Sequence, residues 1–172
     1  EMGFKSRRKP SFDIQNPSQV EALYGAFMAL RASIIPQTGL LDEDFFFYYE
    51  ETEWCSRIGK AGYQILFDPK LHIIHTGGAS TKGFSKAAAV ELFRSRLLYW
   101  EKTLTPIQVT LLYSWHIPKL VFDCCFYLVM ATLTVGRQSR LNAKLANKLT
   151  LLNWLAQGKP ESWGLPDRIK PN

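Results

Sequence analysis

Residues 40–80 decide the fold of this chain, and they read LLDEDFFFYYEETEWCSRIGKAGYQILFDPKLHIIHTGGAS. The aromatic run at residues 45–49 is continuous and bounded by turn-forming residues, which indicates a segment buried on both faces. It leads directly into the carboxylates Glu50, Glu51 and Glu53. Desolvation beside a buried segment raises the pKa of a carboxylate and suits it to act as a base near neutral pH. The alternative is a helix start that gathers acidic residues to complement the helix dipole.

The residues after the aromatic run are predicted to form one helix and two short strands. A helix over residues 50–62 places Glu53 and Arg57 one turn apart, where the two side chains are expected to pair. Residues 63–67 alternate like a strand, and after an Asp-Pro turn residues 71–75 form a second strand.

His75 closes this second predicted strand and precedes a glycine pair, Gly77-Gly78. A lone histidine at a strand end is more often structural than a ligand. A junction between a strand and a glycine loop is, however, a place where binding residues are commonly displayed. The glycines allow the loop to wrap around a ligand or to expose backbone N–H groups.

The sequence before residue 40 has the character of a lead-in. Residues 1–18 contain two prolines, no apolar period and four basic residues, Lys5, Arg7, Arg8 and Lys9. They predict a mobile basic loop, for which a solvated linker is favoured over a phosphate contact. Residues 20–35 are apolar and fit helix and strand periods only in part. Gly25 within them lets another backbone or a ligand approach closely, although periodicity favours simple tight packing.

Residues 85–103 predict a helix with Ser85 as its N-cap. Its apolar side chains recur at steps of three and four residues, and they are Val90, Phe93, Leu97 and Trp100. Arg94 and Arg96 make the helix basic and suit it to forked contact with phosphate, although surface arginines usually remain solvated.

The last third of the chain changes character. Residues 120–135 are almost wholly apolar, yet shorter than the about 20 residues of a membrane-spanning helix. They predict a re-entrant or interfacial segment, or a hydrophobic helix that packs on the part of the protein missing from residues 1–172. Basic residues (Arg137, Arg140, Lys144, Lys148) and leucines (Leu141, Leu145, Leu149, Leu152) then follow on separate stripes. This pattern is typical of an amphipathic helix on anionic lipid, although a soluble helix with a polar outer face shows it too.

The bulk composition limits the class of protein. The chain has 172 residues, 47% of them hydrophobic, which predicts one globular domain or a small domain with an appendage. A net charge of +6 favours an anionic partner. Nucleic acid is set aside, because no basic and aromatic constellation of a known nucleic-acid module is present. Cys55, Cys124 and Cys125 are predicted to be reduced thiols in a cytosolic context. Because Glu1 follows no initiator Met or signal peptide, the chain is expected to be part of a longer one.

A series of motifs then occurs in a fixed order over residues 22–103. They are Gly25-Ala26-Phe27-Met28 with Arg31, Gly39-Leu40-Leu41-Asp42-Glu43-Asp44-Phe45-Phe46, Tyr48-Tyr49-Glu50-Glu51-Thr52-Glu53, Arg57, Gly62-Tyr63, Pro69 and His75-Thr76-Gly77-Gly78-Ala79-Ser80. In order and spacing they resemble the C-terminal half of the catalytic domain of glycosyltransferase family two. These are inverting enzymes of GT-A fold, and the resemblance is greatest to the rhamnosyltransferase-like branch.

The resemblance implies a reaction in which a carboxylate deprotonates an acceptor hydroxyl, which then attacks the anomeric carbon of a nucleotide sugar. Glu51 matches the general base and Glu53 a second acid, each where the family has Asp, and Glu50 stands beside them. The extra methylene of Glu51 leaves open whether it is the base or whether the backbone shifts to compensate. Donor or acceptor binding is expected at Gly25, Asp42, Glu43, Arg57, Gly77, Gly78, Ser80, Arg94 and Arg96.

The resemblance also implies a divalent metal, Mg²⁺ or Mn²⁺, that stabilises the leaving diphosphate. His75 matches a position near the metal, whereas the main Asp-x-Asp ligands are expected in an N-terminal half that residues 1–172 lack. The chain alone is therefore expected to bind a nucleotide sugar poorly and to be inactive.

The expected fold is α/β, the C-terminal half of a GT-A domain followed by hydrophobic and amphipathic helices. Residues 1–103 are expected to form the acceptor side of the catalytic domain, residues 104–157 a membrane-associating helical region and residues 158–172 an irregular tail. The predicted function is sugar transfer to a lipid-linked or polysaccharide acceptor in cell-envelope or exopolysaccharide assembly, at the cytoplasmic face of a membrane. The alternative is a non-catalytic membrane-associated scaffold or a degenerate transferase.

Overall fold

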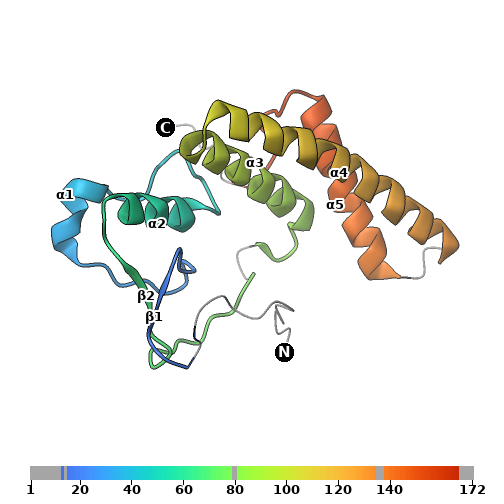
Figure 1. The fold of residues 1–172 in the computed structure, drawn as a ribbon. Coiled ribbons are helices and arrows are strands. Elements are labelled where there is room, and N and C mark those ends of the chain that lie inside the picture. Colours follow the sequence, from blue (N-terminus) through green and yellow to red (C-terminus); the bar gives the residue numbers. More distant parts are fainter. Residues whose placement is uncertain (1–12, 14, 79–80, 135–137, 167–172) are drawn as a thin grey trace. The chain divides into compact units, whose positions relative to one another are not determined.

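The computed structural model describes residues 13, 15–78, 81–134 and 138–166 (Figure 1). The predicted basic loop with Lys5, Arg7, Arg8 and Lys9 lies outside these residues, as do Ser80 and Arg137. The chain divides into two compact units, one of Glu1–Asp42 with Glu50–Thr76 and the other of Glu43–Tyr49 with Gly77–Asn172. Helices and a small antiparallel two-stranded sheet together make a mixed, mainly helical fold. The predicted combination of helices and strands is present, whereas the GT-A fold stays a prediction.

The first unit is built on an antiparallel strand pair. Strand β1 (Ser18–Val20) pairs with β2 (Ile65–Phe67), with Gln19 opposite Leu66. A 3₁₀ turn η1 (Ala32–Ile34), a short helix α1 (Ile35–Thr38) and helix α2 (Glu50–Lys60) complete the unit. Its core is apolar and consists of Ile34, Cys55, Ile58 and Ile65, with Met28 among the partly buried side chains packed against it.

Helix α2 confirms the predicted helix, and β2 confirms the first predicted strand in shorter form. Gly59 lies inside α2 rather than at its end. The chain leaves the helix through Gly62, whose φ of +86° is a left-handed conformation that favours glycine. The N–H of Tyr63 donates to the carbonyl of Ile58 at 3.2 Å, which closes the last turn.

The second predicted strand, residues 71–75, does not form, and no residue between 68 and 78 of the described chain lies in a strand. Leu71 and Ile73 are exposed, and Ile74 is fully exposed. An alternating pattern forms a strand only where a neighbouring backbone accepts its hydrogen bonds. The partner that β2 finds is β1, and residues 71–75 have no such partner in the described part.

Two further segments that were expected to be packed or buried are partly exposed. The segment around Gly25 is irregular, and its Tyr24 and Phe27 are exposed rather than tightly packed. Of the aromatic run, Phe45 is buried but Phe46 is exposed. Tyr48 and Tyr49 have positive φ angles of 68° and 69°, which no regular strand contains.

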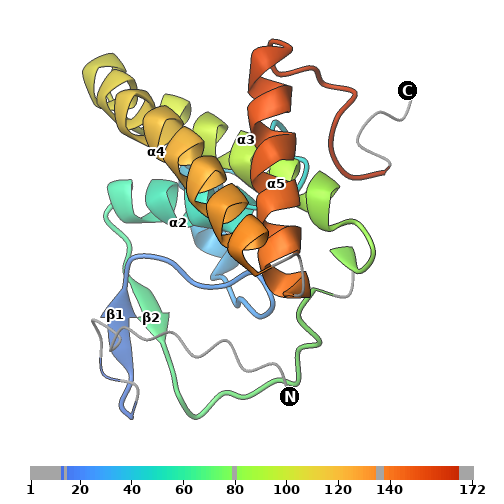
Figure 2. The ribbon, with the colours of Figure 1, turned by 90° about the vertical axis from the view of Figure 1, so that its right-hand side faces the viewer.

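The second unit packs three long helices beside one another (Figure 2). They are α3 (Ser85–Thr103), α4 (Pro106–Leu133) and α5 (Ser139–Ala156). Their common core contains Val90, Phe93, Leu97, Leu120, Leu151 and Trp154. Helix α3 has the predicted bounds, but Phe84 rather than Ser85 occupies the N-cap position and makes no side-chain cap bond.

The apolar segment predicted at residues 120–135 is corrected by helix α4, because residues 120–133 are only the second half of a helix of 28 residues. Thr105 and Gln108 cap its start reciprocally, and Pro118 lies inside it. A helix tolerates an internal proline when tertiary packing outweighs a cost of about 3 kcal/mol. Packing holds both sides of Pro118, since His116 contacts Trp100 of α3 and Leu120 is buried.

Helix α4 is long enough and apolar enough to cross a membrane. Its 28 residues span about 42 Å at 1.5 Å per residue. Many of its large apolar side chains are exposed, among them Ile107, Leu111, Trp115, Val121, Phe122, Phe126, Val129 and Leu133. One side of the helix therefore packs against α3 and α5, and an apolar side is uncovered in the described chain.

The compact units do not part at residue 103, since α3 belongs with α4 and α5. The short segment before α2 also belongs to the second unit. There Ser95 Oγ donates to the carbonyl of Phe47 at 2.7 Å, and Lys102 pairs with Asp44 at 2.6 Å. The division of the chain by function at residues 103 and 157 stays a prediction.

Candidate active site

Glu51 lies in the first turn of α2, and Gly25 approaches its carboxylate. The backbone N–H of Gly25 donates to Glu51 Oε1 at 3.4 Å. A Cβ at position 25 would lie 3.5 Å from the carboxyl carbon of Glu51, an ordinary van der Waals contact, so Gly25 lies directly against this carboxylate. The other oxygen, Oε2, is buried and has no hydrogen-bond partner among the described residues. A buried carboxylate oxygen that receives no hydrogen bond within the protein can accept a hydrogen bond, or the proton itself, from the hydroxyl group of a ligand.

Glu50 precedes Glu51 and shares its surroundings. Burial raises the pKa of Glu50, a backbone hydrogen bond opposes this, and the charge of Glu51 raises it further. Its Oε2 atom is likewise buried without a partner in the described chain. Two adjacent carboxylates with unsatisfied oxygens go beyond what helix-dipole complementarity requires, because that role is served by solvated side chains.

Glu53 and Arg57 form the predicted pair. Arg57 Nε lies 2.8 Å from Glu53 Oε1, and the Glu53 side chain is only 6% exposed. The remaining nitrogens of Arg57 donate to the backbone carbonyls of Thr38 and Leu40. The pair therefore fastens the loop at Gly39 to α2. Roles in catalysis for Glu53 and in ligand binding for Arg57 stay predictions.

Gly39 is required by this loop. Its φ of +66° is left-handed, and a Cβ there would lie 3.1 Å from Arg57 Nη1. Its carbonyl accepts a hydrogen bond of 2.9 Å from Trp54 Nε1 on α2. Asp42, a predicted binding residue, follows this loop in the first unit, whereas Glu43 begins the segment that belongs to the second.

His75 is exposed and lies edge-on to the Tyr24 ring, with centroids 5.9 Å apart. Within the described ranges, no group of three or more His, Cys, Asp or Glu residues could hold a metal ion. The described residues thus do not fit a complete metal site, and we derive no step through a metal. Gly77 and Gly78 belong to the second unit, where the Gly78 carbonyl accepts from the N–H of Thr81 at 3.2 Å.

Arg94, a predicted phosphate-binding residue, is engaged within the second unit. Its Nη1 lies 2.9 Å from Glu91 Oε2, and Glu91 is fully buried. Its Nη2 donates to the carbonyls of Pro160 and Trp163 at 3.0 and 2.5 Å. These contacts tie the segment after α5 to α3, so the geometry favours a structural role.

Arg96 differs from Arg94 because it lines a cavity of about 350 Å³ between α3, α4 and α5. Sequence reasoning did not assign other polar residues of this cavity to a site, and they are His116, Lys119, Asp123, Lys144, Asn147 and Lys148. The i,i+4 spacings of Lys119 with Asp123 and of Lys144 with Lys148 were the available signal. The basic residues of α5 had been assigned to a lipid-facing stripe, whereas Lys144 and Lys148 line this cavity.

Comparison with known proteins relates the chain to glycosyltransferases. It is 30% identical over 117 residues to the low-salt glycan biosynthesis hexosyltransferase Agl10 of Haloferax volcanii, covering 63% of this chain and 38% of that protein. It is 26% identical over 87 residues to the rhamnosyltransferase WbbL of Escherichia coli, covering 51% of this chain and 33% of that protein. It is 34% identical over 59 residues to the N-acetylglucosaminyl-diphospho-decaprenol L-rhamnosyltransferase of Mycobacterium tuberculosis, covering 34% of this chain and 19% of that protein.

These relatives confirm the predicted resemblance to rhamnosyltransferase-like glycosyltransferases. The chain spans less than two fifths of the length of each of them. No protein-family model matches the chain, and no solved structure matches it significantly.

Proposed function

We propose that this chain is the acceptor-side part of an inverting nucleotide-sugar glycosyltransferase of GT-A fold, with Glu51 as the general base. The observation that carries the proposal is the carboxylate of Glu51. One of its oxygens accepts the N–H of Gly25, and the other is buried without a partner in the described chain. The glycosyltransferase relatives support the reaction class.

In the proposed reaction, Glu51 Oε2 takes the proton of an acceptor hydroxyl as its oxygen attacks the anomeric carbon of the donor sugar. The bond from that carbon to the nucleotide diphosphate breaks, and the electron pair leaves with the diphosphate. Attack opposite the leaving group inverts the anomeric centre. Burial raises the pKa of the neighbouring Glu50, which indicates that the start of α2 is partly shielded from water.

The substrate class follows from the relatives and from helix α4. The mycobacterial relative is named for rhamnose transfer to an N-acetylglucosaminyl-diphospho-decaprenol, which supports a lipid-linked acceptor. The exposed apolar side chains of α4 support membrane association, either peripheral or shallowly inserted. We place the enzyme at the cytoplasmic face of the membrane, in assembly of a cell-envelope glycan or polysaccharide.

The test is Glu51→Gln in the full-length protein, assayed for transfer with UDP- and dTDP-sugars as donors. The amide keeps the shape of the side chain but cannot accept the proton, so transfer should fall by about 100-fold or more while circular dichroism stays unchanged. Glu21→Gln, an exposed position in the same unit, is the matched control and should retain activity. Undiminished transfer by Glu51→Gln would exclude Glu51 as the base and favour the alternative, a membrane-associated scaffold or degenerate transferase.

A further inference from the structure

The cavity between α3, α4 and α5 has an excess of positive charge. Among its lining residues in the described chain, Arg96, Lys119, Lys144 and Lys148 are cationic and Asp123 is the carboxylate. Four cations from three helices outnumber the one carboxylate, so the cavity has a positive potential that attracts an anion.

Asp123 offsets only part of this charge. Lys119 Nζ lies 2.9 Å from Asp123 Oδ1, and Lys148 Nζ lies 2.8 Å from Asp123 Oδ2. Both pairs use the same carboxylate, whose single negative charge cannot balance two lysines. The geometry therefore leaves Arg96 and Lys144 as cations directed at the cavity without a carboxylate partner there.

Arg96 is held in position before any ligand arrives. Its guanidinium lies 4.7 Å from the centroid of the Phe93 ring and 5.3 Å from that of Trp100. Its Nε atom is buried and has no hydrogen-bond partner among the described residues. A buried N–H of a guanidinium without an acceptor is costly, and an oxyanion is the ligand that satisfies it best.

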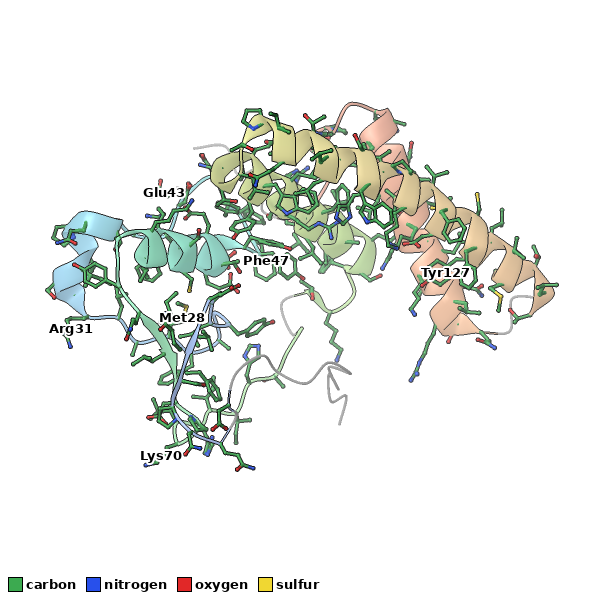
Figure 3. All side chains as sticks on the ribbon, in the orientation of Figure 1. Met28, Arg31, Glu43, Phe47, Lys70 and Tyr127 are labelled. Carbon is green, nitrogen blue, oxygen red and sulfur yellow. The ribbon has the colours of Figure 1, made fainter. Side chains whose placement is uncertain are left out.

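The α5 side of the cavity offers a second unsatisfied group. Asn147 Oδ1 is buried without a partner in the described chain, and rotation of this amide would present its NH₂ donors instead. Lys144 Nζ lies 5.7 Å from the ring centroid of Tyr127, which Figure 3 shows on α4. Donors from α3 and α5 thus face one space of about 350 Å³, enough for a phosphate or diphosphate group.

The remaining wall of the cavity is apolar, and it includes Leu92, Phe93, Leu120 and Leu151. Helix α4 supplies part of this wall and also bears the exposed apolar side chains that suit a bilayer surface. A cationic pocket on such a helix fits a molecule with a phosphate head and an apolar tail.

We propose that this cavity is a phosphate-binding site, with Arg96 and Lys144 as the binding cations, and that it takes the phosphate or diphosphate head of a membrane amphiphile. Only the membrane as the source of the phosphate rests on the proposed function. The binding itself is independent of Glu51.

The test measures binding by the full chain to two probes. Inorganic pyrophosphate is titrated calorimetrically, and phosphatidylcholine vesicles are sedimented with and without phosphatidic acid. Arg96→Gln and Lys144→Gln should each weaken pyrophosphate binding by about tenfold, the value of one charge-assisted hydrogen bond. Both variants should also lose the added affinity for phosphatidic acid while retaining any binding to phosphatidylcholine alone.

The matched control is Arg140→Gln, which removes the same charge from an exposed position of α5 that does not line the cavity. It should change pyrophosphate affinity by less than about twofold, because an exposed charge outside the pocket contributes little. If Arg96→Gln fails to fold, Lys144→Gln tests the site alone, since Lys144 is exposed and not part of the core.

Equal losses in all three variants, or no binding of either probe by the wild type, would overturn the site. Pyrophosphate binding that depends on Arg96 and Lys144, with no preference for phosphatidic acid, would support the site and overturn the membrane source. Neither readout involves sugar transfer, so this inference and the role of Glu51 stand or fall separately.

Discussion

Lys148 on α5 donates a hydrogen bond of 2.8 Å to Asp123 on α4, and this contact joins the two helices beside the cavity. The hydrogen bond from Lys148 holds the pKa of Asp123 below its ordinary value, and Lys119 adds to the effect. Charged and titratable groups from three helices line the same cavity as Asp123: Arg96 on α3, His116 and Lys119 on α4, and Lys144 and Lys148 on α5.

The sign of the pH dependence follows from the lowered pKa. Asp123 contributes stability above its unfolded pKa of about 3.9, and this contribution disappears as the pH falls through the lower folded value. Asp123→Asn should therefore lower stability by about 1 kcal/mol at neutral pH and flatten the acid limb of the pH profile. Thermal unfolding at stepped pH measures both effects, with the exposed Glu161→Gln as control. An acid limb as steep in Asp123→Asn as in the wild type would contradict this assignment.

Two glycines of the first unit should respond to alanine in opposite directions. Gly39→Ala puts a Cβ at a left-handed φ and 3.1 Å from Arg57 Nη1, so it should destabilise by about 1–2 kcal/mol. Gly59 lies inside α2 with open space around it, so Gly59→Ala should stabilise by about 0.5–1 kcal/mol.

Hydrogen exchange of the α2 amides measures both changes, because it reports local opening within one unit. Slower exchange in Gly39→Ala, or faster exchange in Gly59→Ala, would contradict the positions of the two glycines.

Arg94 distinguishes a structural from a ligand-binding arginine. Arg94→Ala removes one ion-pair partner of Glu91, a fully buried carboxylate, together with the hydrogen bonds to the carbonyls of Pro160 and Trp163, and should cost about 3 kcal/mol. Urea unfolding followed by tryptophan fluorescence measures the loss, since the Arg94 guanidinium lies 5.3 Å from the Trp154 ring centroid. Arg140→Ala, at an exposed position, should change stability by less than about 0.5 kcal/mol. If both variants change stability by equally small amounts, Arg94 has no structural role and is again a candidate ligand-binding residue.

Glu51→Asp in the full-length protein introduces the residue that the resemblance leads one to expect. The shorter side chain withdraws the carboxylate from the Gly25 N–H, which donates to it at 3.4 Å. A displacement of about 1 Å can cost about 100-fold in rate, so transfer should fall by up to that factor while the fold is retained. Steady-state transfer assays beside Glu51→Gln provide the measurement. A rate equal to or above that of the wild type would show that the backbone is placed for Asp.

Local pattern was sufficient for some elements. Helix α3 was predicted because its apolar side chains recur at helical spacing. Helix α2 was predicted as the segment that follows the aromatic run, and the Glu53–Arg57 pair follows from one helical turn within it. Strand β2 was predicted from alternation, but the same alternation at residues 71–75 was misleading. Alternation of apolar and polar residues determines which side chains of a strand share a face, but it does not determine whether another strand lies beside it to form hydrogen bonds.

The sequence by itself determined the order of the motifs, and with it the relation to glycosyltransferases and the choice of Glu51. It also determined helix α3, whose apolar periodicity is contained within a few turns, and the place of helix α2 directly after the aromatic run. Tertiary structure decided the pairing of the charges. Arg94 is engaged by Glu91 and the segment after α5, whereas Arg96, two residues along the same helix, lines a cavity with Lys144. The physical reason is that a cation takes its role from the carboxylates and carbonyls that distant segments bring within hydrogen-bonding distance, and local sequence does not specify them.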